Sequence, residues 1–165
     1  MKQLYLLRHA KSEPWNPLGN DFSRALSETG AHDAQTVAEW ATEKLQAPDT
    51  VLCSPAKRTR QTLAPFLSQW PQLLSVTDYV DSMYGASLNM LCTLMEDAFS
   101  YSERLFMVGH NPGFEALLIS VLQPGQAAAI QKMSTGTLAV IEFADNFRRD
   151  AHDGSLLHRV RRKNI

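Results

Sequence analysis

The sequence predicts a layered α/β fold in one domain, residues 1–165. Apolar runs of strand length alternate with amphipathic helical segments, as expected when helices pack on a sheet. Two of these runs, Leu4–Leu7 and Leu105–Val108, continue into a histidine within two residues, with turn residues or a helix start just beyond. A length of 165 residues and a hydrophobic fraction of 44% suit a globular domain with a real core.

The first half of the chain predicts two strands and a helix between them. Leu4–Leu7 forms the first strand, and a polar loop with two prolines and a glycine follows over residues 11–26. Ser27 can cap a helix, because its hydroxyl can accept a bond from a free amide of the first turn. The second strand is Val51–Cys53. The apolar positions of the helix are Ala31, Ala34, Ala38, Ala41 and Leu45.

A second helix is expected after Ser54-Pro55, with Pro65 inside it. Proline lacks an amide hydrogen and its ring collides with the carbonyl four residues earlier, that of Gln61. We therefore expect a kink or an early end at this point. The inner face of this helix carries Leu63, Phe66, Leu67 and Trp70.

The next segments repeat the alternation of strand and helix. Leu74–Val80 predicts a third strand, Ser87 caps a helix, and Leu105–Val108 is the fourth strand. A further helix begins in the turn 109–113 and ends at Pro124-Gly125. The apolar positions of these two helices are Leu88, Leu91, Cys92 and Met95, then Phe114, Leu117, Leu118 and Val121.

Two strands close the fold. Thr137–Phe143 and Leu156–Val160 flank a loop that contains Asp153-Gly154, which is typical of an antiparallel hairpin.

Composition excludes several classes of partner and compartment. The net charge of −1 gives no general attraction to nucleic acid or to an anionic membrane, and no apolar run is long enough for a membrane span. The chain opens without a secretory signal, and Cys53 and Cys92 lie in apolar segments, which indicates free thiols in a reducing compartment. We expect a cytoplasmic monomer without a structural zinc site.

Basic residues are concentrated near the C-terminus. Only Asp150 and Asp153 balance them there. Such a stretch is either a solvated strand and tail or a patch that steers an acidic or phosphorylated partner. The basic residues are Arg148, Arg149, Arg159, Arg161, Arg162 and Lys163.

Arg8 and His9 form a pair suited to phosphoryl chemistry. A neutral imidazole nitrogen can accept a phosphoryl group, and a neighbouring arginine both pairs with phosphate oxygens and lowers the histidine pKa. Arg58 lies in the first turn of the second helix, where free amides and the helix dipole favour an anion. His110 follows the fourth strand and can donate to a phosphate oxygen when protonated. Ligands bind at the carboxyl ends of strands in such sheets, so these four residues predict a phosphate pocket.

The chain resembles the histidine phosphatase (phosphoglycerate-mutase-like) superfamily and, within it, the small SixA-type phosphohistidine phosphatases. The resemblance spans roughly residues 3–143. Its motifs are Leu7-Arg8-His9-Ala10, Asp21-x-x-Arg24-x-Leu26-Ser27-x-x-Gly30, Ser54-Pro55-x-x-Arg58-Thr59-x-Gln61-Thr62 and Val108-Gly109-His110-Asn111-Pro112, with a weaker match at Met133-Ser134-Thr135-Gly136.

The resemblance implies a three-layer α/β/α architecture with a mostly parallel sheet, ahead of the C-terminal antiparallel hairpin. It implies that His9 is the phosphorylated nucleophile, and that Arg8, Arg58 and His110 bind the phosphate. Ser134 and Thr135 are expected to contact substrate. Arg8, Arg58 and a cationic His110 would replace a metal ion, so we expect neither a metal nor another cofactor.

The proton donor and the substrate are less clearly determined by the sequence. Asp81 aligns with an acidic position of small family members, with Asp21 and Glu13 as alternatives. The chain lacks the long insertion that covers the pocket of larger members. An open pocket favours phosphohistidine in a protein, such as a histidine-containing phosphotransfer domain. The alternatives are a phosphatase or mutase for small phosphate esters and, in a different class, a phosphate-binding module without turnover.

Overall fold

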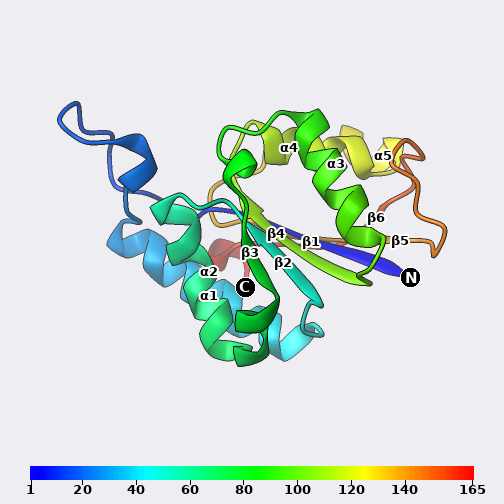
Figure 1. The fold of residues 1–165 in the computed structure, drawn as a ribbon, viewed down its shortest axis with the longest axis horizontal. Helices are drawn as coiled ribbons and strands as arrows, with labels where there is room; N and C mark the ends of the chain where they lie inside the picture. Colours follow the sequence, from blue (N-terminus) through cyan, green and yellow to red (C-terminus); the bar gives the residue numbers. More distant parts are fainter.

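The computed structural model describes residues 1–165 and contains one six-stranded sheet (Figure 1). Its strands follow the order β3-β2-β4-β1-β5-β6. β1 is parallel to β4, and β2 is parallel to both β4 and β3, whereas β5 and β6 are antiparallel to their neighbours. The predicted mostly parallel sheet with a C-terminal hairpin is confirmed. The strands are Lys2–Arg8 (β1), Thr50–Cys53 (β2), Thr77–Tyr79 (β3), Arg104–Gly109 (β4), Leu138–Phe143 (β5) and Ser155–Val160 (β6).

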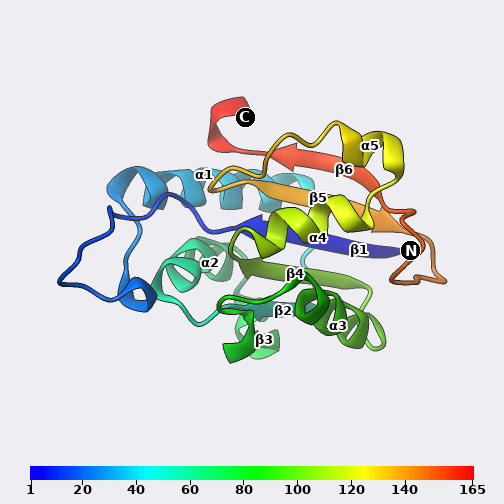
Figure 2. The same cartoon turned by 90° about the horizontal axis from the view of Figure 1, so that it is seen from above.

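Helices cover both faces of the sheet, which makes the predicted three layers (Figures 1 and 2). Side chains alternate between the faces along β1: Leu4 and Leu6 pack in the cluster with α3 and α4, whereas Tyr5 and Leu7 pack in the cluster with α1 and α2. Both faces of the central strands are buried, so these strands read as continuous apolar runs. The helices are Glu28–Lys44 (α1), Lys57–Gln69 (α2), Leu88–Phe99 (α3), Gly113–Val121 (α4) and Pro124–Ala128 (α5).

Both predicted helix caps are present. The Ser27 hydroxyl accepts a bond from the Gly30 amide at 3.0 Å, and the Ser87 hydroxyl accepts one from the Met90 amide at 3.2 Å. The apolar face of α1 differs in detail from the prediction, because Ala31 is exposed and Val37 is buried. The alanine-rich sequence left the choice of face open, and packing against α2 and the sheet decided it.

The predicted early end at Pro65 was wrong, because α2 continues through Pro65 to Gln69. Proline costs about 3 kcal/mol inside a helix. Continuing the helix keeps Phe66 and Trp70 buried, at 1% and 8% exposure, in the core cluster that contains β2. Full burial of each large apolar side chain contributes about 1.5–3 kcal/mol, so packing outweighs the lost bond.

Two other boundaries differ from the prediction. The third strand covers only Thr77–Tyr79, because residues 71–76 form 3₁₀ turns and Leu74 is 67% exposed. Pro71 starts the turn, and Leu73 rather than Leu74 is buried in the core. Pro124 follows the end of α4, as expected, but it also starts the short helix α5, since proline suits the first turn of a helix.

The carboxyl ends of β1, β2 and β4 lie at one edge of the sheet. Arg8 at the end of β1 is in register with Gly109 at the end of β4, and Cys53 at the end of β2 is in register with Val108. The segments that follow these three strands therefore meet at this edge. Cys53 and Cys92 are buried free thiols, as predicted. None of the helices has the length and apolar character needed to cross a membrane.

Gly30 should be essential for stability, because α1 crosses the chain after His9 at very short range. A β-carbon at Gly30 would lie 1.9 Å from the Lys11 carbonyl oxygen. We expect Gly30→Ala to lower the free energy of unfolding by about 1–3 kcal/mol, although alanine is the better helix former. Denaturant unfolding measures the change.

Gly125→Ala is the matched control, because a β-carbon there meets nothing within 4 Å. Gly125 lies in a helix, so alanine should be neutral or should stabilise by up to about 1 kcal/mol. Equal stabilities of the two variants would contradict the close approach at Gly30.

Candidate active site

His9 and His110 face each other at the carboxyl edge of the sheet. Their ring centroids are 5.3 Å apart. His9 directly follows β1 and His110 directly follows β4, so the parallel register of these strands brings the two rings together. His9 is 7% exposed, and the His110 ring is also largely enclosed.

The His9 ring is held in one orientation and one tautomer. Its Nδ1 lies 2.8 Å from the Ala10 carbonyl oxygen. A carbonyl can only accept, so Nδ1 carries the proton and Nε2 keeps its lone pair. Burial is the main cause that lowers the pKa of His9 to about 4, and the charges of Arg58 and Arg8 act in the same direction. The ring is therefore neutral and nucleophilic at Nε2 over the physiological pH range.

His110 is also neutral while the site holds no anion. Burial lowers its pKa to about 3, with Arg58 as the next cause. Its Nε2 lies 2.7 Å from the Ser54 hydroxyl, whereas its Nδ1 is buried without a partner. The ring of Tyr84 packs edge-on against it with 5.6 Å between centroids. His110 therefore has one ring nitrogen bonded to Ser54, and its other ring nitrogen is available to a ligand.

Arg58 enters from the first turn of α2 and is oriented by Asp21. Its Nη1 donates to the Asp21 carbonyl at 2.7 Å and its Nη2 to the Asp21 carboxylate at 3.1 Å. Arginine has five N–H donors, so hydrogens remain for a second acceptor. The Asp21 carboxylate also accepts from Tyr84 at 2.6 Å and from Arg24 at 2.8 Å. The Tyr84 bond is the main cause that lowers the pKa of Asp21 to about 2.

Arg8 is positioned by the loop before β5. Its Nη1 donates to the Met133 carbonyl at 2.9 Å. That loop is in turn fixed from α4 and the turn before it: the Glu115 carboxylate accepts from the Met133 amide at 2.7 Å, and the Asn111 side chain donates to the Met133 carbonyl at 2.9 Å. Burial lowers the pKa of Arg8, while the Glu115 charge opposes this. Arg8 thus stays oriented at the same edge as His9.

One hydroxyl of α2, that of Thr62, reaches back to the backbone after β1. Thr62 accepts a bond from the Ala10 amide at 3.0 Å and donates to the Arg58 carbonyl at 2.7 Å. Thr59 instead donates within its own turn, to the carbonyls of Ser54 and Ala56. Thr62 therefore connects the backbone after His9 to the helix that carries Arg58.

The remaining candidates lie around this cluster. Asp81 is exposed at a 3₁₀ turn and its carboxylate makes no hydrogen bond. Glu13 is exposed, and only its backbone touches the site region, where its carbonyl accepts from Arg24 at 3.3 Å. Ser134 and Thr135 lie in the loop between Met133 and Gly136, whose amide bonds to the Arg8 and His9 carbonyls.

Sequence reasoning did not single out several residues that shape this site. Ser54 stood only in a motif, and Asp21 was considered as a proton donor rather than as a partner of Arg58. Their contacts with His110 and Arg58 could not be read from spacing. Tyr84 carried one signal, since it lies three residues after Asp81 in the same segment. Asn111 and Glu115 act through the loop before β5, which is distant in sequence.

Buried donors without partners gather in this cluster. Six buried side-chain polar atoms lack a hydrogen bond, and three of them are Arg8 Nε, Arg58 Nε and His110 Nδ1. Buried polar groups are nearly always satisfied, so three unpaired nitrogens on residues of the same sheet edge are consistent with a site for an acceptor-rich anion. The structure contains no group of three or more His, Cys, Asp or Glu side chains that could hold a metal ion.

Comparisons with known proteins identify the family. The model of the histidine phosphatase superfamily (branch 1) matches residues 4–81. A structure from Agrobacterium tumefaciens, assigned as the phosphohistidine phosphatase SixA, is 30% identical with a TM-score of 0.84, covering 96% of this chain and 97% of that one. An uncharacterized Mycobacterium tuberculosis protein is 31% identical over 147 residues, covering 86% of this chain and 89% of the relative. A phosphoserine phosphatase from Entamoeba histolytica shares the fold at 14% identity and a TM-score of 0.66, covering 96% of each chain.

The chain belongs to the histidine phosphatase superfamily, and it is a phosphatase. The expected class of fold and enzyme is thereby confirmed.

Both site histidines should titrate far below the ordinary histidine range in the ligand-free protein. An NMR titration of the ring Cε1 protons, assigned with His9→Ala and His110→Gln variants, should give midpoints near 4 and 3. In urea the same protons should titrate near the usual value of about 6.5. Added vanadate should raise the midpoint of His110, because a nearby anion favours imidazolium.

The lowered pKa values of His9 and His110 also determine how the free energy of unfolding changes with pH. Between about pH 6.5 and pH 4 the unfolded chain binds protons that the folded site does not, so these histidines make folding less favourable as pH falls. A ligand-free midpoint at or above 6.5 for either ring would contradict the buried neutral pair.

Proposed function

We propose that this enzyme removes phosphate from phosphohistidine in a protein, through a phosphohistidine intermediate at His9. The observation that carries the proposal is the neutral His9 ring, with Nδ1–H on the Ala10 carbonyl and a free Nε2, among two arginines and His110. The three unpaired nitrogens around it are the donors that equatorial phosphate oxygens would accept from.

In the first step, the lone pair of His9 Nε2 forms a bond to phosphorus while the bond from phosphorus to the substrate nitrogen breaks. Nδ1 keeps its proton on the Ala10 carbonyl, so the phosphorylated ring is cationic. Arg8 and Arg58 stabilise the charge on the equatorial oxygens. His110 becomes protonated as the anion binds and donates through Nδ1, because the dianion offsets the burial that otherwise keeps the ring neutral.

In the second step, water attacks phosphorus opposite Nε2. The new O–P bond forms as the P–Nε2 bond breaks, the electron pair returns to Nε2, and one water proton leaves to solvent. The cationic ring is a good leaving group, so this step also needs little acid assistance. Inorganic phosphate then departs and His9 is neutral again.

The surroundings of the carboxylates favour a substrate that needs no strong proton donor. Asp21 has a pKa of about 2, so it is ionised at neutral pH and suits orientation of Arg58 rather than proton donation. Asp81 and Glu13 are both exposed. Asp81 remains the candidate donor for ester substrates, because it lies in the turn before Tyr84, whose ring packs against His110. A phosphohistidine whose second ring nitrogen is protonated leaves as neutral imidazole, so it requires no donor. An ester must leave as an alkoxide or be protonated.

The access to the site also favours a protein substrate. Only residues 80–87 join β3 to α3, so no long insertion of the chain lies at this place. A protruding phosphohistidine side chain, such as that of a phosphotransfer domain, could reach His9 there. We further propose that the enzyme acts in the cytoplasm, where its buried free thiols remain reduced, and without a metal.

The phosphoenzyme is tested by rapid-quench trapping with labelled substrate. We expect an acid-labile, base-stable phosphoryl group on His9. His9→Ala should lose several orders of magnitude in kcat, because no nucleophile remains, while its circular dichroism stays unchanged. Label on serine, cysteine or aspartate would contradict the mechanism.

The substrate class is tested by comparing kcat/KM for a phosphohistidine peptide, a phosphoserine peptide and sugar phosphates, in the presence of a chelator. We expect the phosphohistidine peptide to be preferred. Asp81→Asn should reduce ester hydrolysis more than phosphohistidine hydrolysis, because only the alkoxide depends on a donated proton. Preference for a small phosphate ester would favour the alternative, a small-molecule phosphatase or mutase. If the chelator abolished activity and an added metal ion restored it, the proposal that the enzyme works without a metal would be contradicted.

A further inference from the structure

The basic stretch near the C-terminus is divided by the fold into two separate clusters. β5 ends at the amino end of β1, since Phe143 is in register with Lys2. The connection that carries Arg148 and Arg149 therefore lies at the sheet edge opposite His9. β6 runs back, and Arg161 to Lys163 follow its end, which is at the same edge as His9 (Figure 2).

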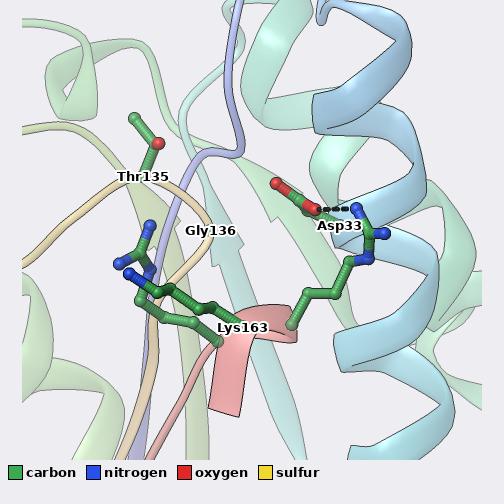
Figure 3. A pocket seen from close by; sticks show the side chains of 6 residues that line it. Asp33, Thr135, Gly136 and Lys163 are labelled. Atoms are coloured by element: carbon green, nitrogen blue, oxygen red, sulfur yellow. Dashed lines mark hydrogen bonds and ion pairs between the residues drawn. The ribbon is translucent and has the colours of Figure 1, made fainter. Parts of the chain in front are cut away.

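A hollow of about 340 Å³ lies beside these C-terminal residues. Figure 3 shows Thr135 and Gly136 on one side of it, Asp33 of α1 opposite, and Lys163 below. Arg161 and Arg162 complete the lining. All of its side chains are polar or charged, so it suits a polar ligand.

The charges in this hollow do not cancel. Asp33 is the only acid in the lining, and Arg162 pairs with it at 3.2 Å. Neither Arg161 nor Lys163 forms an ion pair with any carboxylate of the chain. Two positive charges therefore remain for an external anion.

The turn that carries these charges is held in place. The Arg161 amide donates to the Asn164 side chain at 2.7 Å, and the Asn164 amide donates back to the Arg161 carbonyl at 2.9 Å. The Arg162–Asp33 pair fixes the turn to α1. The side chains of Arg161 and Lys163 are therefore attached to an ordered backbone, which reduces the conformational entropy lost when they bind an anion.

The hollow and the phosphate site share one loop. The Gly136 amide bonds to the carbonyls of Arg8 and His9, and a β-carbon at Gly136 would lie 3.8 Å from Ala10. Leu7 of β1 is in register with Leu138 of β5, which is in register with Val160 of β6. Two inter-strand spacings separate β1 from β6, so the backbone at Arg161 lies about 10 Å from that at Arg8.

We propose that the hollow formed by Arg161, Lys163, Thr135 and Gly136 is a second recognition site, which binds an aspartate or glutamate carboxylate of the phosphoprotein substrate. The inference rests on the proposed function. The spacing of about 10 Å corresponds to about three residues of extended chain, at 3.3 Å each. The preferred substrate therefore carries acidic residues about three positions from its phosphohistidine.

The test uses two phosphohistidine peptides of otherwise identical sequence. At the positions three and four residues from the phosphohistidine, one peptide has aspartates and the other has asparagines. We expect the wild-type enzyme to have a kcat/KM about three- to tenfold higher for the aspartate peptide, through KM. The preference should decrease with added salt, because exposed charges are screened. The double substitution Arg161→Ala/Lys163→Ala should abolish it with kcat nearly unchanged.

Arg148→Ala/Arg149→Ala is the matched control, because it removes the same charge from the opposite edge and should keep the preference. Lys163→Ala alone should reduce the preference for the aspartate peptide by half or more. Lys163 is exposed and its side chain makes no hydrogen bond, so this single variant replaces the double variant if the latter is less stable.

Equal hydrolysis of both peptides by the wild type would overturn the inference and leave the proposed function standing. So would a preference that survives loss of Arg161 and Lys163, or one that the control variant also loses. Hydrolysis of p-nitrophenyl phosphate but of neither peptide would overturn the proposed function, and this inference with it.

Discussion

Positive charge concentrated at one edge of the sheet, without enough acid to neutralise it, is the constraint on which the active site depends. Arg58 is buried and Arg8 is half-buried beside two histidines, and burial of the imidazoles together with these charges keeps both of them neutral. Asp21 is the one carboxylate paired with Arg58. The site therefore has less negative charge than its arginines would neutralise, and a bound phosphoryl group would supply more, together with hydrogen-bond acceptors. In the proposed mechanism, the same charges that bind this group also help to keep His9 unprotonated.

A second layer of hydrogen bonds maintains this unfavourable gathering of like charges. Thr62 joins the backbone after His9 to α2, and Met133 accepts from Arg8 while Asn111 and Glu115 hold its loop. Asp21 holds Arg58 from the polar loop that precedes α1. Buried arginines would otherwise favour positions nearer to solvent, so the cost of burying them is offset by burial of apolar side chains on both faces of the sheet.

The two ends of the sheet serve different purposes in this arrangement. The carboxyl edge collects the phosphate site and the ordered turn with Arg161 and Lys163, whereas the amino edge collects the β5–β6 connection. Because the β3–α3 segment is short, we propose that the substrate is recognised by surfaces beside the pocket rather than by a cover over it. A charged hollow about two strands from the nucleophile fits recognition of a macromolecule, because a small ester does not extend that far.

The sequence by itself determined the order of strands and helices, both serine caps, the two buried cysteines and the four residues that meet at the candidate phosphate site. These features depend on local periodicity, on capping chemistry and on the rule that parallel strands deliver ligands at their carboxyl ends. Local signals were insufficient where packing competes with propensity, so Pro65 stayed within α2 and Leu74 stayed outside the sheet. Only the tertiary structure decided that Asp21, Ser54 and Tyr84 contact Arg58 and His110, and that one basic stretch divides between two edges. Pairing across the sheet, rather than spacing along the chain, sets those distances.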